Sequence, residues 1–352
     1  MIAKRDRLPT PSTPVAADGS AHYGVFERPF QTLNLASATF PFYGAAMPRG
    51  LVRSRLKEFQ HVGIIGPDFY FGMAIVDVKY VGTFFTYFVD RQSGSFVERN
   101  ARSFIGGRKL PENCWDHHGF FNADGIFAHL HNHLDQKSYR VSMEVPARGT
   151  TPKMAAELEL GFDLESIEPL IAVLPVGAGR TNYTIKCPLR ASGEIHVGDR
   201  VIRCDKEGCV ALLDEHKALY PASMWWKWAT FAGRDASGRV LAVNLTHNVN
   251  EDDERYNECA FWLDHKLHLL SAVRFEFDAV DHLRPWRIRT TDGRVDLEFR
   301  PQGERKELID FIVARSQFHQ PFGTFHGTVE LDDESIDIDG LFGVCEDHRV
   351  RW

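Results

Sequence analysis

The sequence predicts an all-β protein in which antiparallel strands build barrels or sandwiches. Three observations support this class: apolar and polar residues alternate with a period of two in many short runs, turn-forming pairs separate several of these runs, and long helical periodicity is scarce. Short strands recur at intervals of roughly 8 to 12 residues, which is typical of β-sandwiches and barrels and not of βαβ units. A chain of 352 residues is long enough for two such domains.

The clearest strands are predicted at residues 157–164 and 273–278. In the first run, Leu158, Leu160 and Phe162 alternate with charged or small residues, so that one face of the strand is apolar and the other polar. Two hairpins are predicted over 231–245 and 286–299, because the pairs Ser237-Gly238 and Asp292-Gly293 tolerate the positive φ of tight turns. These strands are therefore expected to be antiparallel neighbours.

Helices are expected to be few and short. Residues 49–60 could form one short helix, and residues 305–316 are ambiguous between helix and strand. The weakest point of the pattern lies around residues 188–215, where apolar strand gives way to polar, turn-rich sequence. We therefore predict a disordered tail at 1–20, one β domain at 21–205 and a second at 206–352.

Composition excludes several classes of function. The formal net charge of −7 leaves no basic surplus to neutralise a nucleic-acid backbone. The N-terminus lacks the apolar core of a signal peptide, and no apolar run approaches the length of a membrane span, so a cytoplasmic protein with reduced cysteines is expected. The run VGAGRTN fails the dinucleotide fingerprint, and there is no phosphate loop, nucleophile elbow or zinc-protease motif. No cofactor is predicted.

Histidines offer the best metal candidates in the chain. His129, His131 and His133 occupy alternate positions, which on a strand places all three on one face. Several β-barrel enzymes present imidazoles to a metal in this way, although the same pattern suits a solvated polar face opposite Leu130 and Leu134. The neighbouring run Asp116-His117-His118 is interpreted as a turn.

The stretch 211–233, ALLDEHKALYPASMWWKWATFAG, combines acid groups with large aromatics. A carboxyl group lined by indole rings is poorly solvated when ionised, so its pKa rises and it can donate a proton near neutrality; Asp214 or Glu215 could be such an acid. Indole faces also stabilise a nearby carbocation. The alternative is a plain strand with Trp226 and Trp228 in the core and with Trp225 and Lys227 outside.

The C-terminal run GLFGVCEDHRVRW repeats this chemistry with Glu346 and its neighbours. A terminal strand that closes a barrel by ion pairs would have the same pattern. Glu258 and Lys186 are isolated charges in apolar runs, and each is either half of an internal ion pair or an edge residue.

From about residue 170 to the end, the chain resembles a bacterial family known only as a numbered domain of unknown function. The resemblance rests on the ordered motifs YTIKCPL, LLDEH, WWKWA, LAVNL, YNECAFW, PWRIRTTDGRVDLEFRP, QPFGTFHG and GVCEDHRVRW. This family is similar to AttH-like proteins and to the carotenoid hydratase called hydroxyneurosporene synthase. The resemblance implies two lipocalin-like β domains in tandem and a barrel wide enough for one small apolar ligand.

The resemblance also implies a function. The hydratases protonate an alkene of an isoprenoid chain and add water without a cofactor, so we expect a hydrophobic ligand and acid catalysis of a lyase or isomerase reaction. The alternative is a non-catalytic carrier or sensor of a lipid-like ligand. Candidate catalytic residues are Asp214, Glu215, Glu258 and Glu346, and candidate ligand-binding residues are Lys186, His216, Trp226, Trp228, Asn244 and Gln320.

Overall fold

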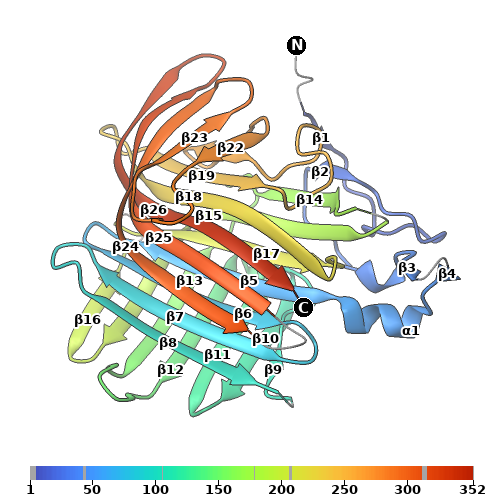
Figure 1. Ribbon diagram of the computed structural model, residues 1–352, viewed down its shortest axis with the longest axis horizontal. Helices are drawn as coiled ribbons and strands as arrows, with labels where there is room; N and C mark the ends of the chain where they lie inside the picture. The colour runs from blue at the N-terminus through green and yellow to red at the C-terminus, as the bar shows by residue number, and fades with distance from the viewer. Residues whose placement is uncertain are drawn as a thin grey trace. The chain divides into compact units, whose positions relative to one another are not determined.

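The computed structural model describes residues 5–42, 45–104, 106–177, 179–205, 208–310 and 315–351, which are nearly all in β-strands and turns. The chain divides into two compact units (Figure 1). The N-terminal unit comprises Leu8–Val173 and Ala178–Leu219, and the C-terminal unit comprises Met1–Arg7, Leu174–Gly177 and Tyr220–Trp352. The predicted all-β class with two antiparallel β units is confirmed: one sheet forms a nearly closed barrel and the other a curled half-barrel.

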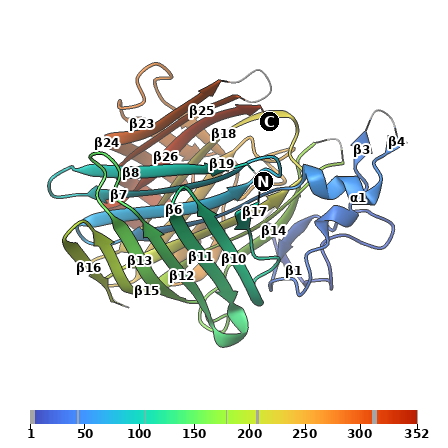
Figure 2. The same cartoon turned by 90° about the horizontal axis from the view of Figure 1, so that it is seen from below.

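The N-terminal unit is built on one long antiparallel path of strands. Its order is β8 (Phe96–Ser103), β7 (Gly82–Asp90), β6 (Phe69–Asp77), β5 (Lys57–Ile65), β17 (Val210–Ala218), β15 (Thr181–Val197), β13 (Met154–Gly161), β12 (Ser138–Val145), β11 (Ile126–His133), β10 (Asp116–Ala123) and β9 (Arg108–Lys109). Figure 2 shows β10, β11 and β12 side by side. The strands β1 (Arg7–Leu8), β2 (Gly24–Phe26), β14 (Leu170–Pro175) and β16 (Arg200–Cys204) attach off this path.

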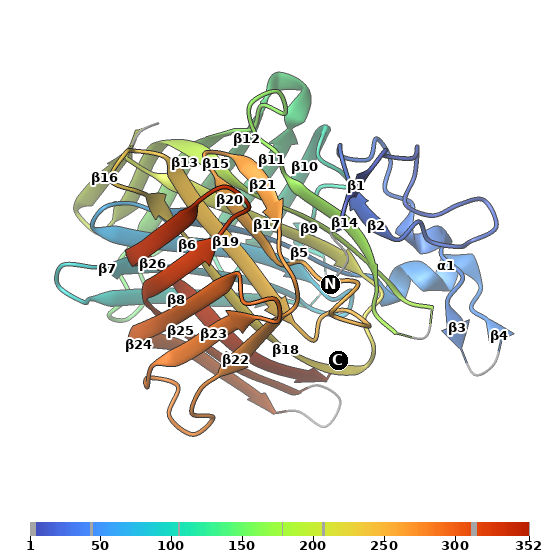
Figure 3. The same cartoon turned by 90° about the horizontal axis from the view of Figure 1, so that it is seen from above.

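The C-terminal unit contains a nine-stranded antiparallel sheet, whose strands are labelled in Figure 3. Its order is β21 (Lys266–Leu269), β20 (Ala260–Leu263), β19 (Val240–His247), β18 (Ser223–Arg234), β26 (Ser335–Arg351), β25 (Arg315–Glu330), β24 (Val295–Asp310), β23 (Trp286–Thr290) and β22 (Val273–Glu276). Both predicted hairpins are present, and Gly238 and Gly293 adopt φ of 86° and 77° in their turns. The ambiguous run 305–316 is strand where it is described.

Helices are as scarce as expected. The predicted helix at 49–60 is reduced to α1 (Arg49–Val52) and a 3-10 turn (Arg53–Arg55), after which β5 begins at Lys57. Other short elements are β3 (Pro41–Phe42), β4 (Ala45–Ala46) and 3-10 turns at Leu35–Ser37 and Leu134–Gln136. The described part of the chain has no helix with the length and apolar character needed to cross a membrane.

Two boundaries differ from those expected. The units divide between Leu219 and Tyr220, not after residue 205, because β17 pairs with both β15 and β5 and so completes the barrel. Part of the expected disordered tail has regular contacts: Val15 is buried, and the Arg5 guanidinium donates hydrogen bonds to the carbonyl oxygens of Cys259 and Leu270.

Each unit has its own apolar core. In β13, Leu158 and Leu160 are buried and Glu157 and Glu159 are exposed, as the alternation predicted. The C-terminal core is built from every second residue of its strands, including Ala229 of β18. Trp226 and Trp228 lie on the opposite face of β18 from this core. Trp228 is nevertheless buried and Trp225 is exposed, as the plain-strand alternative expected, whereas Trp226 is partly exposed and Lys227 is buried.

Trp286 should contribute strongly to the C-terminal core. Its side chain is fully buried, stacks on Phe277 with ring centroids 4.0 Å apart, and donates a hydrogen bond to the His282 carbonyl oxygen. We expect Trp286→Ala to lower the free energy of unfolding by about 3–5 kcal/mol, because it removes a large buried ring. Urea unfolding followed by circular dichroism measures this. Val280→Ala, at a site that is 95% exposed, is the control and should change it by less than about 0.5 kcal/mol. A loss below about 1 kcal/mol for Trp286→Ala would contradict the packing.

Candidate functional site

Asp214 and Glu215 lie on opposite faces of β17. Side chains alternate along a strand, and Glu215 shares its face with Leu213, which belongs to the N-terminal core. Asp214 shares the other face with His216. The two predicted acids therefore cannot serve one site on this strand, and each must be judged from its own surroundings.

Asp214 is the centre of a buried polar group. It accepts a hydrogen bond from the Lys186 ammonium at 2.7 Å, and His216 Nε2 lies 3.2 Å from its second oxygen. His216 Nδ1 is 3.0 Å from Asn182 Oδ1, and the imidazole stacks on Phe59. Burial raises the pKa of Asp214, but attraction to Lys186 and His216 outweighs it and holds the pKa well below its usual range. This shift is opposite in direction to the raised pKa that was expected of a proton donor.

Glu215 has the shifted pKa that was expected of a proton donor. It is 1% exposed, and burial raises its pKa although Lys217 Nζ lies 3.7 Å away. The Asn132 amide donates a hydrogen bond to it at 3.2 Å. The surroundings are packed core side chains, including the fully buried Tyr183. Glu215 is thus a buried acid in the interior of the N-terminal barrel, beside Lys217 and Asn132.

Five of the predicted residues share one face of the nine-stranded sheet. This face, called here the tryptophan face, carries Trp226, Trp228, Asn244, Gln320 and Glu346. The register brings them together because β18 pairs with β26, β26 with β25 and β18 with β19. Apart from the partly exposed Trp226, all are buried, with exposed fractions of 8% or less. The sequence placed these residues in one candidate site, and within this unit they do share one surface.

Glu346 is positioned by two neutral donors. Trp226 Nε1 donates to one carboxylate oxygen at 2.7 Å, and Gln320 Nε2 donates to the other at 3.0 Å. His348 Nδ1 lies 3.7 Å from the first oxygen, and His348 Nε2 is 2.8 Å from Ser316 Oγ. A carboxylate, an imidazole and a hydroxyl thus follow one another across β26 and β25.

Trp228 and Asn244 continue this face toward β19. The Trp228 indole N–H donates to Asn244 Oδ1 at 2.7 Å, and the Asn244 amide donates to the backbone carbonyl oxygen of Glu258 at 2.7 Å. The Glu258 carboxylate is fully buried and lies 3.5 Å from the Asn250 amide. Glu258 therefore contacts the tryptophan face only through its backbone carbonyl group, which Asn244 binds. Its carboxylate interacts with Asn250 and is not part of the site around Glu346.

The opposite face of the same sheet carries a cluster of titratable residues, of which Lys227 and Asp347 lie in runs analysed from the sequence and His282, Glu304 and His319 were not singled out. Lys227 pairs with Asp347, whose other oxygen is 3.1 Å from His282 Nε2. His282 stacks on His319 with ring centroids 4.0 Å apart, and His319 Nδ1 is 2.7 Å from the Glu304 carboxylate. These residues come from separate segments, so only the strand register brings them together.

A groove of about 390 Å³ opens next to this group at the ends of the strands. It is lined by Ser223, Met224, Trp225, Arg315, Gln317, Arg349, Val350 and Arg351. Within the described residues Arg349 has no ion pair.

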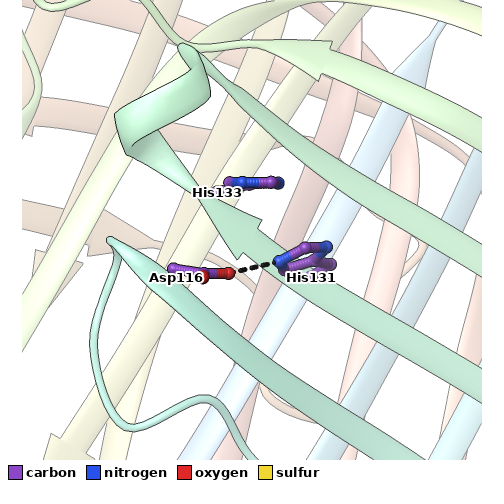
Figure 4. A group of neighbouring side chains, drawn as sticks. All are labelled: Asp116, His131 and His133. Atoms are coloured by element: carbon purple, nitrogen blue, oxygen red, sulfur yellow. Dashed lines mark hydrogen bonds and ion pairs between the residues drawn. The ribbon is translucent and has the colours of Figure 1, made fainter.

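Two groups of side chains in the described chain could hold a metal ion. One is Asp116, His131 and His133 on the N-terminal barrel, drawn in Figure 4, and the other is His282, Glu304 and His319. The run Asp116-His117-His118 begins β10 and is not the turn that was expected, because it pairs with β11.

The chain belongs to a family described as a domain of unknown function, DUF2804, whose match spans residues 9–352. The predicted relationship is thus confirmed and extends through the N-terminal half, where the resemblance in sequence is faint. No curated protein matches the chain.

Solved structures with a similar fold include CghA, at 13% identity and a TM-score of 0.56 over 99% of this chain and 97% of CghA. CghA with Sch210972 gives 12% identity and a TM-score of 0.53 over 97% of both chains. A putative AttH from Nitrosomonas europaea has 14% identity and a TM-score of 0.46, covering 83% of this chain and 92% of its own. Kievitone hydratase from Nectria haematococca has 9% identity and a TM-score of 0.46, covering 84% and 88%. The likeness to CghA shows a shared fold.

The Lys186–Asp214 pair should make stability depend on acid pH. The folded-state pKa of Asp214 lies below its unfolded value of about 4, so its contribution to stability is complete above that value and is lost as the pH falls below it. At pH 7 we expect Asp214→Asn to cost about 3–5 kcal/mol, because Lys186 is left buried without its counter-charge. Urea unfolding between pH 3 and pH 7 measures both effects.

The matched control for this prediction is the double variant with Lys186→Met. It should lose less stability than the sum of the two single variants, since no charge is then left unpaired. Strict additivity of the two losses, or an unchanged acid response in Asp214→Asn, would contradict the ion pair.

Proposed function

We propose that this chain binds a small, largely apolar organic ligand on the tryptophan face and catalyses a cofactor-independent lyase or isomerase reaction by proton transfer through Glu346. The observation that carries the proposal is the setting of this carboxylate. It is 7% exposed, and its two hydrogen bonds come from the neutral groups of Trp226 and Gln320. The two donors fix the orientation of the carboxylate, which a group that transfers a proton to or from a bound molecule requires.

His348 extends this carboxylate into a proton-transfer path. Its Nδ1 faces Glu346 at 3.7 Å and its Nε2 bonds to Ser316 Oγ at 2.8 Å, so a proton can pass between hydroxyl, imidazole and carboxylate with small movements. The indole of Trp226 lies against this imidazole, with ring centroids 4.3 Å apart. Addition of water to an alkene, and the shift of a double bond, each require a general acid and a second group that takes the proton back.

The aromatic residues support an apolar, cation-forming substrate. Protonation of an alkene leaves a carbocation, and the negative face of an indole ring stabilises a nearby cation. Trp226 and Trp228 lie two positions apart on one face of β18, with Glu346 opposite Trp228 in the register. An apolar molecule lying across these rings would have the carboxylate beside it. CghA, which shares the fold, has been crystallised with the small molecule Sch210972.

A second function, non-catalytic carriage of a similar ligand, is favoured by the state of Asp214. A carboxylate neutralised by Lys186 is a stable ion pair rather than a proton donor, so that part of the predicted catalytic set is better suited to structure or to ligand recognition. In this alternative Glu346 anchors a polar group of the ligand by hydrogen bonds and no bond is made or broken.

The test is mass spectrometry of apolar molecules that co-purify with the full chain and with Glu346→Gln, which keeps the size of the side chain and its hydrogen bond to Trp226. We expect the wild type to carry a product-like molecule, and the variant to carry an unconverted precursor with the conversion reduced by about 10²–10⁴-fold. The same molecule in equal amount on both proteins would support carriage and reject catalysis.

Two further variants locate the ligand. Trp226→Phe should lower the amount of bound molecule, whereas Trp225→Phe, on the opposite face of β18 and 39% exposed, should not. Binding that is lost in Trp225→Phe and kept in Trp226→Phe would reject the tryptophan face.

A further inference from the structure

Five potential metal ligands line the face of the N-terminal barrel that points away from its core. They are Asp116, His118, His129, His131 and His133, called here the histidine ladder. In the pairing of β10 with β11, Asp116 is opposite His133 and His118 is opposite His131. The intervening residue Leu130 faces the core, so alternation directs the ladder outward.

The side chains of the ladder are already close to one another. His131 Nε2 is 2.8 Å from Asp116 Oδ1, and one ligand atom from each of Asp116, His131 and His133 lies within 4.8 Å of the others (Figure 4). The His131 ring centroid is 4.2 Å from that of His133 and 3.8 Å from that of His118. His118 Nδ1 is in turn 3.0 Å from His129 Nε2.

We propose that Asp116, His131 and His133 bind a divalent first-row transition-metal ion of the zinc type, with His118 as the adjacent imidazole that can complete the site. Zinc is held by imidazole nitrogen and carboxylate oxygen at about 2.0–2.2 Å, in tetrahedral sites. One ligand atom from each of the three residues already lies within 4.8 Å of the others, close enough for all three to contact a single ion after small side-chain movements. Asp116 and His118 are exposed, which leaves the site open to an entering ion.

Two details distinguish the ladder from an ordinary polar surface. His131 and His133 are only partly exposed, with 14% and 19% of their side chains accessible, and the His131 ring is stacked between those of His118 and His133. Within the described residues His133 Nδ1 is buried and has no hydrogen-bond partner, while Asp135 lies 3.5 Å from its other nitrogen. A carboxylate behind a histidine is the usual arrangement that orients a metal-binding imidazole.

Isothermal titration of the full, metal-free chain with zinc chloride tests the site. We expect one zinc ion per chain at the ladder, and affinity lower by on the order of 100-fold or more in His131→Ala/His133→Ala. His117→Ala is the matched control. His117 belongs to the same strand, but alternation places its side chain on the other face. The zinc affinity of this variant should therefore equal that of the wild type. Circular dichroism of each variant verifies that it is folded, and His131→Gln replaces the double variant if that one is not.

The remaining outcomes overturn the proposal. Zinc that binds His131→Ala/His133→Ala as it binds the wild type, or a wild type that binds no zinc at micromolar concentration, rejects the ladder as a site. Zinc binding that is lost in His282→Ala/His319→Ala and kept in the ladder variants assigns the ion to the other group. Because the titration uses no organic ligand, its result is independent of the function proposed for the tryptophan face.

Discussion

Hydrogen-bonded pairing of neighbouring strands, with side chains alternating between the two faces, is the constraint on which the rest of this protein depends. A charged or polar side chain that pairing places on a buried face must find a partner there, because an unpaired buried charge costs several kcal/mol. The partner is supplied by the residue opposite in the register or one rung away. Lys186 meets Asp214 in this way across β15 and β17, and Lys227 meets Asp347 across β18 and β26.

In the C-terminal unit, β18 and β26 each contribute side chains to two different faces of the sheet. The odd-numbered positions of β18 and β26 carry Lys227 and Asp347 beside the core, and the even-numbered positions carry Trp226 and Glu346 on the tryptophan face. A change of one residue in register would exchange the two sets. The face that carries the Lys227–Asp347 ion pair lies beside the core, where the pairing of opposite charges stabilises the fold. On the tryptophan face, by contrast, the Glu346 carboxylate is held by hydrogen bonds from the neutral indole of Trp226 and the amide of Gln320.

Sequence reasoning identified the elements that depend on local pattern. The alternation around Leu158 and the Gly293 turn predicted a strand and a hairpin that are present. Sequence reasoning could not show which residues far apart in the chain lie opposite each other in the sheets. Asp214 was expected beside indole rings, but its neighbour in the N-terminal unit is Lys186, 28 positions earlier, and no local pattern reveals that register. Glu304 faces His319 only after a bulge between Pro301 and Gly303 shifts the alternation of β24, a change that hydrophobic periodicity does not record.

The most direct test of this account is a ¹H–¹⁵N spectrum of the tryptophan indole N–H groups in the wild type and in variants that remove each acceptor. If the register is as described, the Trp226 indole resonance moves when Glu346 is replaced by alanine, and the Trp228 resonance moves when Asn244 is replaced by alanine. The Trp286 resonance, whose acceptor is the His282 carbonyl oxygen, stays in place in both. A Trp226 resonance that does not respond to the loss of the Glu346 carboxylate would contradict the arrangement of the tryptophan face.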